Sequence, residues 1–265
     1  MNTLIKAEIR RLLATRIWRG LLLAATLLGG GMVGAMALVG PENFQPPMPG
    51  LDTEPGVRSI LGILGYTAFI PAAVGTLAVT SEYRHRTAAV TFLFAPRRSL
   101  VLGAKLIAYG LAGLAFGLIL SGTAAIALFG VAAARGVPLG LPNLTVIGLL
   151  ARIGVAMAAY LLIGVGVGAL VRHQVVALSV VIGYLYLGET LLMLIPGVNR
   201  LYPFLPGGAT ASLTDFTYLA EAISQQTSMA PVSLLSPVAG ALVLLAYAMS
   251  AAVAALMVPM RRDVT

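Results

Sequence analysis

The sequence predicts an all-α polytopic membrane protein with about six transmembrane helices, and three observations carry this prediction. Hydrophobic residues make up 59% of the 265 residues, charged residues make up only 10%, and the apolar residues form long runs. This composition excludes an ordinary water-soluble domain. A helix needs roughly 20 residues to cross a hydrocarbon core of about 30 Å, so the spans use nearly the whole chain. Little length is left for a soluble catalytic domain.

Residues 1–16 precede the first long apolar run and predict a helix that lies in the headgroup layer of the membrane. Their apolar residues recur at helical spacing: Leu4, Ile5, Ile9, Leu12 and Leu13. Lys6 and Arg10 lie one turn apart on another face, where they meet anionic lipid. The alternative is a basic flank that only orients the first span. No cleavage pattern follows the apolar run, so we expect the first span to be retained.

A transmembrane domain is predicted over residues 17–259, followed by a cytoplasmic tail at 260–265. Six spans make up this domain: 17–39, 60–80, 100–132, 144–171, 175–195 and 237–258. Glycines repeat at short helical intervals in the third and fourth spans: Gly110, Gly113, Gly117, Gly164, Gly166 and Gly168. Small residues at such intervals let helices approach closely, so they predict a compact bundle.

The distribution of basic residues predicts that both termini are cytoplasmic. With the N-terminus inside, all but four of the 17 Lys and Arg residues fall on the inner side, the exceptions being Arg58, Arg135, Arg152 and Arg200. Most acidic residues then fall on the outer side: Glu42, Asp52, Glu54, Asp215 and Glu221. We therefore expect a multi-pass protein of the cytoplasmic (inner) membrane. The net charge of +8 is explained by these inner loops, so nucleic-acid binding is not expected.

The segment between the fifth and sixth spans, residues 196–236, predicts a re-entrant element. It is too broken by Pro196, Gly197, Pro203 and Pro206 to form a spanning helix, yet it is too apolar for an aqueous loop. Irregular backbone at membrane depth must be buried in protein or face a wet cavity. The alternative is an outer loop that packs on the ends of the spans.

A polar segment between the second and third spans stands out in so apolar a chain. Its residues are Glu82, Tyr83, Arg84, His85, Arg86, Thr87, Pro96, Arg97, Arg98 and Lys105. Ser81 is expected to cap a short helix with Glu82 in its first turn, so that the cations that follow can pair with an acidic groove on a soluble partner. The alternative is that these charges only set topology, although Glu82 does nothing for the positive-inside rule.

Taken with the six spans, the basic leader and the segment at 196–236, these residues resemble the membrane subunit of type-2 ABC exporters. One departure is Arg86, where that family commonly has Gly before the Thr. The resemblance implies an exporter of two permeases, either two copies of this chain or one with a homologous permease, and two ATPase subunits. It also implies a coupling helix over Glu82–Arg98 that docks in a groove of the ATPase. Substrates across that family include hydrophobic drugs and antibiotics, lipids and polysaccharides.

The chain itself is not expected to be an enzyme. It contains no Gly-Lys-Ser/Thr phosphate loop, so ATP and Mg are expected only in the partner ATPase. Cysteine is absent, and His85 and His173 are the only histidines and lie near inner turns, so no metal site is predicted. No Gly-x-Ser-x-Gly nucleophile motif occurs.

Two charged residues lie within predicted spans and are candidates for a functional site. Arg152 in the fourth span and Glu189 in the fifth fall at similar depth, so they are expected to form a structural pair or to face the transport pathway. Four neighbours in the same spans are candidates for pathway lining or for packing: Tyr160, Tyr184, Tyr186 and Met193. Two other functions stay open: an ion-coupled secondary transporter that uses Arg152 and Glu189, and a non-transporting assembly subunit.

Overall fold

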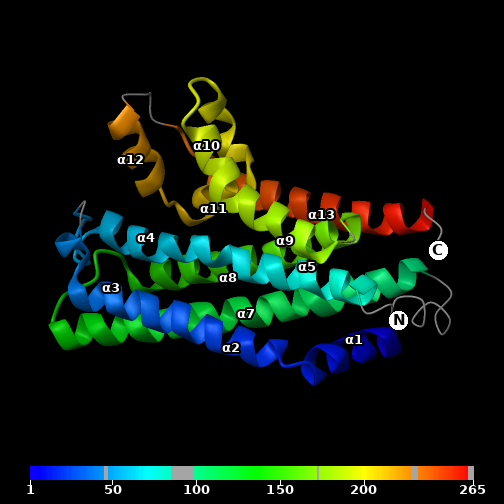
Figure 1. Ribbon diagram of the computed structural model, residues 1–265. Helices are drawn as coiled ribbons and strands as arrows, with labels where there is room; N and C mark the ends of the chain where they lie inside the picture. The colour runs from blue at the N-terminus through cyan, green and yellow to red at the C-terminus, as the bar shows by residue number, and fades with distance from the viewer. Residues whose placement is uncertain (45–46, 85–97, 172, 228–231, 262–265) are drawn as a thin grey trace.

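The computed structural model describes residues 1–44, 47–84, 98–171, 173–227 and 232–261, and these form helices without strands (Figure 1). Within these ranges, six helical stretches are long and apolar enough to cross a membrane: Ile17–Val39, Glu54–Arg84, Leu100–Arg135, Asn143–Leu170, Gln174–Met193 and Pro237–Ala254. The chain is therefore a multi-pass membrane protein, as predicted. Both termini lie at one end of the bundle and the connection between the first and second spans lies at the other.

The N-terminal segment is helical, as predicted, and forms α1 (Asn2–Ala14), which packs against the third span. The first span follows as α2 (Ile17–Thr26), a π-helical turn (Leu27–Met32) and α3 (Val33–Val39). The π-helical turn contains Gly29, whose backbone lies directly against the backbone of Leu120. A side chain at position 29 would collide there, so glycine sets how closely the first and third spans approach.

The second span is longer than the predicted 60–80. It consists of α4 (Glu54–Ile63), a 3-10 turn (Leu64–Ala68) and α5 (Phe69–Arg84). It begins early because the Thr53 hydroxyl accepts a hydrogen bond of 3.2 Å from the Gly56 amide, an N-cap that the sequence reading missed. It ends late because nothing interrupts α5 before Arg84. Ser81 and Glu82 thus lie in the last turn of α5, and the prediction that Ser81 caps a new helix is wrong.

The third and fourth spans form the centre of the bundle. They are α7 (Arg98–Arg135) and α8 (Asn143–Leu170), and α8 packs against α5, α7 and α13 (Pro237–Arg261). Glycines lie at these contacts, as predicted: Gly113 and Gly117 of α7 face α8, while Gly164 and Gly168 of α8 face α5. Thr76 of α5 also donates a 3.1 Å hydrogen bond to the Gly164 carbonyl. Close packing of this kind interlocks α5, α7 and α8.

The fifth span is α9 (Gln174–Gly183), a π-helical turn (Tyr184–Gly188) and α10 (Glu189–Met193). It begins where the His173 ring accepts a hydrogen bond from the Val176 amide. The fifth span and α13 bury little of their apolar surface inside the chain, since only 17% of the most apolar window of each is buried. Lipid or a second copy of the chain must cover these faces.

Between α10 and α13 the chain folds into a 3-10 helix (Val198–Phe204), α11 (Pro206–Thr214) and α12 (Tyr218–Thr227). Figure 1 shows α10 and α12 rising beside the bundle at the end far from the termini. Nearly every residue of α11 is buried, mainly against α13 and the preceding 3-10 helix, with further contact to α8. The segment is therefore a packed helical unit, and its depth in the bilayer remains a prediction.

Candidate functional site

An ion-pair cluster joins three helices at the end of the bundle that holds the termini. It consists of Lys105 on α7, Glu82 on α5, and Glu8 and Arg11 on α1, and we call it the Lys105 cluster. The Lys105 ammonium lies 2.8 Å from a Glu8 carboxylate oxygen and 2.7 Å from Glu82 Oε1. Arg11 also pairs with Glu82 Oε1. Two positive and two negative charges thus balance one another in a site where the Lys105 side chain is only 3% exposed.

The spacing of α1 explains how this short helix supplies two members of the cluster. Glu8 and Arg11 are three residues apart and so lie on one face, which packs against α7. Sequence reasoning missed Glu8. The available signal was a lone acid in a leader whose other charged residues are basic, because topology does not require a negative charge there.

The Lys105 cluster brackets the predicted coupling segment along the chain. Glu82 is the first residue of that segment and Lys105 the last, and both are buried, so they hold the ends of the segment and do not lie on the protein surface as predicted. The predicted residues His85, Arg86, Thr87, Pro96 and Arg97 lie outside the described residues, and Arg98 is the first residue of α7.

Two other described members of the predicted segment, Tyr83 and Arg84, are the last residues of α5. Arg84 is exposed and donates a 3.2 Å hydrogen bond to the Gln174 side chain at the start of α9. Tyr83 packs against a small apolar cluster between α5, α7 and α8. Arg84 therefore offers a surface contact, whereas Tyr83 contributes to packing.

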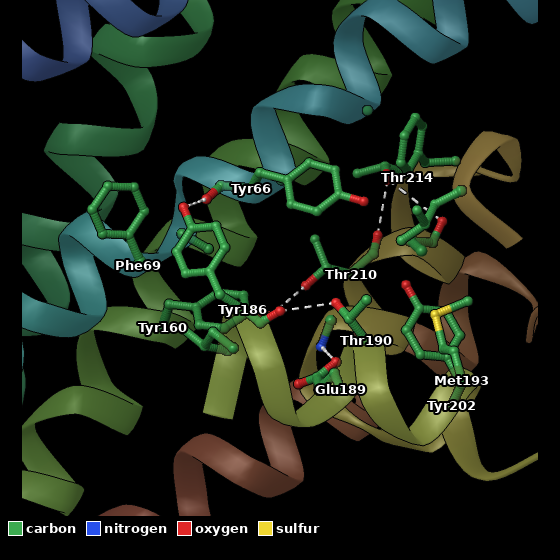
Figure 2. Close-up of a pocket in the computed structure, with 18 residues that line it drawn as sticks. Tyr66, Phe69, Tyr160, Tyr186, Glu189, Thr190, Met193, Tyr202, Thr210 and Thr214 are labelled. Atoms are coloured by element: carbon green, nitrogen blue, oxygen red, sulfur yellow. Dashed lines mark hydrogen bonds between the residues drawn. The ribbon is translucent and has the colours of Figure 1, made fainter. Parts of the chain in front are cut away.

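A second candidate site is a pocket between the second span, α8, the fifth span and the segment that contains α11 (Figure 2). We call it the aromatic pocket, because its walls carry six rings: Tyr66, Phe69, Tyr160, Tyr186, Tyr202 and Phe216. Phe69 and Tyr186 meet edge to face with ring centroids 5.5 Å apart. About 60 Å³ of the pocket is open to water-sized molecules. The walls are otherwise mostly apolar, with three threonine hydroxyls: Thr190, Thr210 and Thr214.

Glu189 supplies the carboxylate of the aromatic pocket. Its Oε2 accepts a 2.8 Å hydrogen bond from the Gly207 amide at the start of α11, where Leu205 provides no side-chain cap. Its Oε1 is buried and has no hydrogen-bond partner in the part of the chain that the structure describes. A side chain on Gly207 would collide with the carboxylate, so glycine permits this close approach.

Arg152 does not pair with Glu189, which was one of the two arrangements that the sequence left open. Its guanidinium lies 3.4 Å from the Asp215 carboxylate, which also receives a 2.8 Å hydrogen bond from Arg58. Asp215 follows α11 in the left-handed region, with a φ of 53°, and this turn brings its side chain to α4 and α8. The expectation considered depth along two spans only, and it left out the acid that the folded 196–236 segment supplies.

The structure brings together three of the four predicted lining residues. Tyr160, Tyr186 and Met193 line the aromatic pocket with Glu189, whereas Tyr184 is not among its lining residues. The Tyr160 hydroxyl is 3.1 Å from that of Thr210. Sequence reasoning missed the aromatic residues that the second span and the 196–236 segment contribute. The aromatic residues can be read from the sequence, but which of them face the pocket depends on how α11 packs.

In the described ranges, no group of three or more His, Cys, Asp and Glu residues is arranged to hold a metal ion. Comparison with known proteins adds no relative: no protein-family model matches the chain, and no curated protein matches it.

Proposed function

We propose that the chain is the transmembrane subunit of an ATP-driven ABC exporter, which works with a separate ATPase subunit. The observation that carries the proposal is the Lys105 cluster, which fixes both ends of the polar segment between the second and third spans. A soluble partner that pushes on this segment would move α5, α7 and α1 together. This is the rigid transmission that coupling to an ATPase requires.

The low exposure of the cluster explains why the transmission would be stiff. Removing one partner from a buried ion pair typically costs about 3–5 kcal/mol, because the remaining charge is left uncompensated. Displacing α1 from α7 would separate Lys105 from Glu8 in the same way. Movement of the inner ends as one body therefore costs less than their separation.

The proposed assembly contains two ATPase subunits, which bind ATP and Mg, and two permeases in the inner membrane with both termini cytoplasmic. The second permease is another copy of this chain or a homologue. The mostly exposed apolar faces of the fifth span and α13 leave room for such a neighbour. The proposed activity is outward movement of a hydrophobic or amphipathic substrate. This direction comes from the sequence resemblance.

An ion-coupled secondary transporter is the second candidate, and the unpartnered Glu189 Oε1 is the observation in its favour. A proton carrier needs a buried carboxylate of this kind. The Arg152 half of the predicted charge relay loses its support, because Arg152 is engaged by Asp215. A non-transporting assembly subunit offers no account of the pocket.

The deciding experiment is capture of an ATPase encoded beside the gene for this chain, followed by ATP hydrolysis measured in lipid with and without the chain. We expect co-purification and substrate-stimulated hydrolysis. Arg84→Ala should weaken capture at least several-fold, because Arg84 is an exposed cation at the inner end of α5. Arg200→Ala is the matched control at an exposed arginine in the 196–236 segment.

Proton-driven transport by the chain alone would overturn the proposal in favour of the secondary transporter. Equal ATPase capture by wild type and Arg84→Ala would remove Arg84 from the docking surface. ATPase capture without any transport of candidate substrates would favour the assembly subunit.

A further inference from the structure

The aromatic pocket contains one polar atom whose bonding is incomplete. Glu189 is 3% exposed, and its Oε1 has no hydrogen-bond partner in the described ranges, although buried carboxylate oxygens are normally paired. Figure 2 shows the carboxylate at the edge of the space enclosed by Tyr186, Thr210 and Tyr202. A ligand that fills this space with a hydrogen-bond donor would complete the site.

We propose that the aromatic pocket binds the primary ammonium group of an amphipathic organic cation, with Glu189 Oε1 as its anionic acceptor. An ammonium group supplies both the positive charge and the N–H donors that this oxygen lacks. Tyr186 and Tyr202 line the same pocket, and the faces of aromatic rings attract cations. Aromatic walls also suit the apolar body of such a molecule.

The single carboxylate of the pocket selects against other cations. A quaternary ammonium has no N–H to offer Oε1. Calcium takes six to eight oxygen ligands and magnesium six, but Glu189 is the only carboxylate among the residues that line the pocket. A primary ammonium matches the single carboxylate, and threonine hydroxyls elsewhere on the wall are acceptors for its remaining donors.

Capping of α11 is the simpler role for Glu189, but it uses only one of the two carboxylate oxygens. Oε2 receives the Gly207 amide at 2.8 Å, while Oε1 takes no part in that contact. Glutamine at this position keeps an oxygen for the Gly207 amide and removes the negative charge. The Glu189→Gln variant thus separates a structural cap from a cation site.

This inference rests on the proposed function in treating the bound cation as cargo, but binding itself is measured without any ATPase. The chain is reconstituted in lipid nanodiscs, and equilibrium binding of radiolabelled phenethylammonium is measured at neutral pH against empty nanodiscs. The neutral probe is 2-phenylethanol, which has the same ring and chain. Wild type should bind the ammonium saturably and at least tenfold more tightly than the alcohol.

Glu189→Gln should weaken phenethylammonium binding at least tenfold and leave binding of the alcohol unchanged. The matched control is Glu221→Gln, an exposed carboxylate on α12 outside the pocket, which should bind like wild type. Equal affinity of wild type and Glu189→Gln, or no saturable binding by wild type, would overturn the proposal. If Glu189→Gln does not insert, the wild-type preference decides, since equal affinity for ammonium and alcohol also overturns it. Loss of ATPase capture leaves each of these outcomes unaffected, so the two proposals fail separately.

Discussion

Replacing Lys105 by methionine tests whether the Lys105 cluster holds α1, α5 and α7 together. Methionine retains much of the side-chain volume but removes the charge that lies 2.8 Å from Glu8 and 2.7 Å from Glu82. The Glu8 and Glu82 side chains are 9% and 11% exposed, so water can compensate their charges only weakly. We expect Lys105→Met to lower the free energy of unfolding by about 3–5 kcal/mol.

A second substitution provides the internal control for this magnitude. Lys105→Met combined with Glu8→Gln leaves the Arg11–Glu82 pair as a balanced unit, so more than half of the loss should return. The residual cost should be about 1–2 kcal/mol, because the introduced glutamine amide has no partner at this buried position. A double-mutant cycle assigns the difference to the Lys105–Glu8 interaction.

The assay is reversible unfolding of purified protein in mixed micelles titrated with a denaturing detergent, followed by circular dichroism. The four proteins are wild type, Lys105→Met, Glu8→Gln and the double variant. A loss below about 1 kcal/mol in Lys105→Met would refute the reasoning, because that is the range of an exposed ion pair. A double variant no more stable than Lys105→Met would also refute it.

Three further predictions follow from other parts of the fold. The chain has no native cysteine, so single introduced cysteines report topology directly. A membrane-impermeant maleimide should label Asn43→Cys in intact cells and Thr265→Cys only after permeabilisation. The opposite labelling pattern would show that the predicted orientation is wrong. Gly164→Val should destabilise the protein by about 1–3 kcal/mol or prevent assembly, because its Cβ would collide with α5, whereas Gly148→Val on the open side of α8 should match wild type in thermal stability by size-exclusion chromatography. Asp215→Asn keeps a residue that tolerates positive φ but weakens the ion pairs with Arg58 and Arg152, so the free energy of unfolding should fall by about 1 kcal/mol in the detergent titration. No change would show that these ion pairs do not stabilise the fold.

The spans were predictable because membrane crossing imposes a length and an apolar composition on every helix. The first span begins at Ile17 and ends at Val39 in both the prediction and the structure. The second span was placed too short at both ends, since hydropathy does not register the Thr53 cap or the polar last turn of α5. Spacing also identified the glycine contacts, because small residues at helical intervals have few other uses.

The sites were harder to predict, because they depend on contacts between distant parts of the chain. Glu82 and Lys105 were recognised as unusual, but their direct pairing with each other and with Glu8 depends on how α1 lies against α7. Arg152 and Glu189 were recognised as intramembrane charges, yet their partners come from the segment after the fifth span. Depth along a helix is readable from sequence, whereas the side on which a folded segment packs is not.

The glycine contacts of α8 have a consequence for how the protein can move. The helix backbones lie in close contact at Gly113, Gly117, Gly164 and Gly168, which leaves little room for movement between them. We therefore expect α5, α7 and α8 to move as one rigid body. The fifth span lacks this interlocking and changes to π-helical geometry over Tyr184–Gly188, one residue before Glu189. Bending of the fifth span is therefore expected at that turn, where Tyr186 and the adjacent Glu189 line the aromatic pocket, so bending there would change the shape of the pocket while α5, α7 and α8 keep their arrangement.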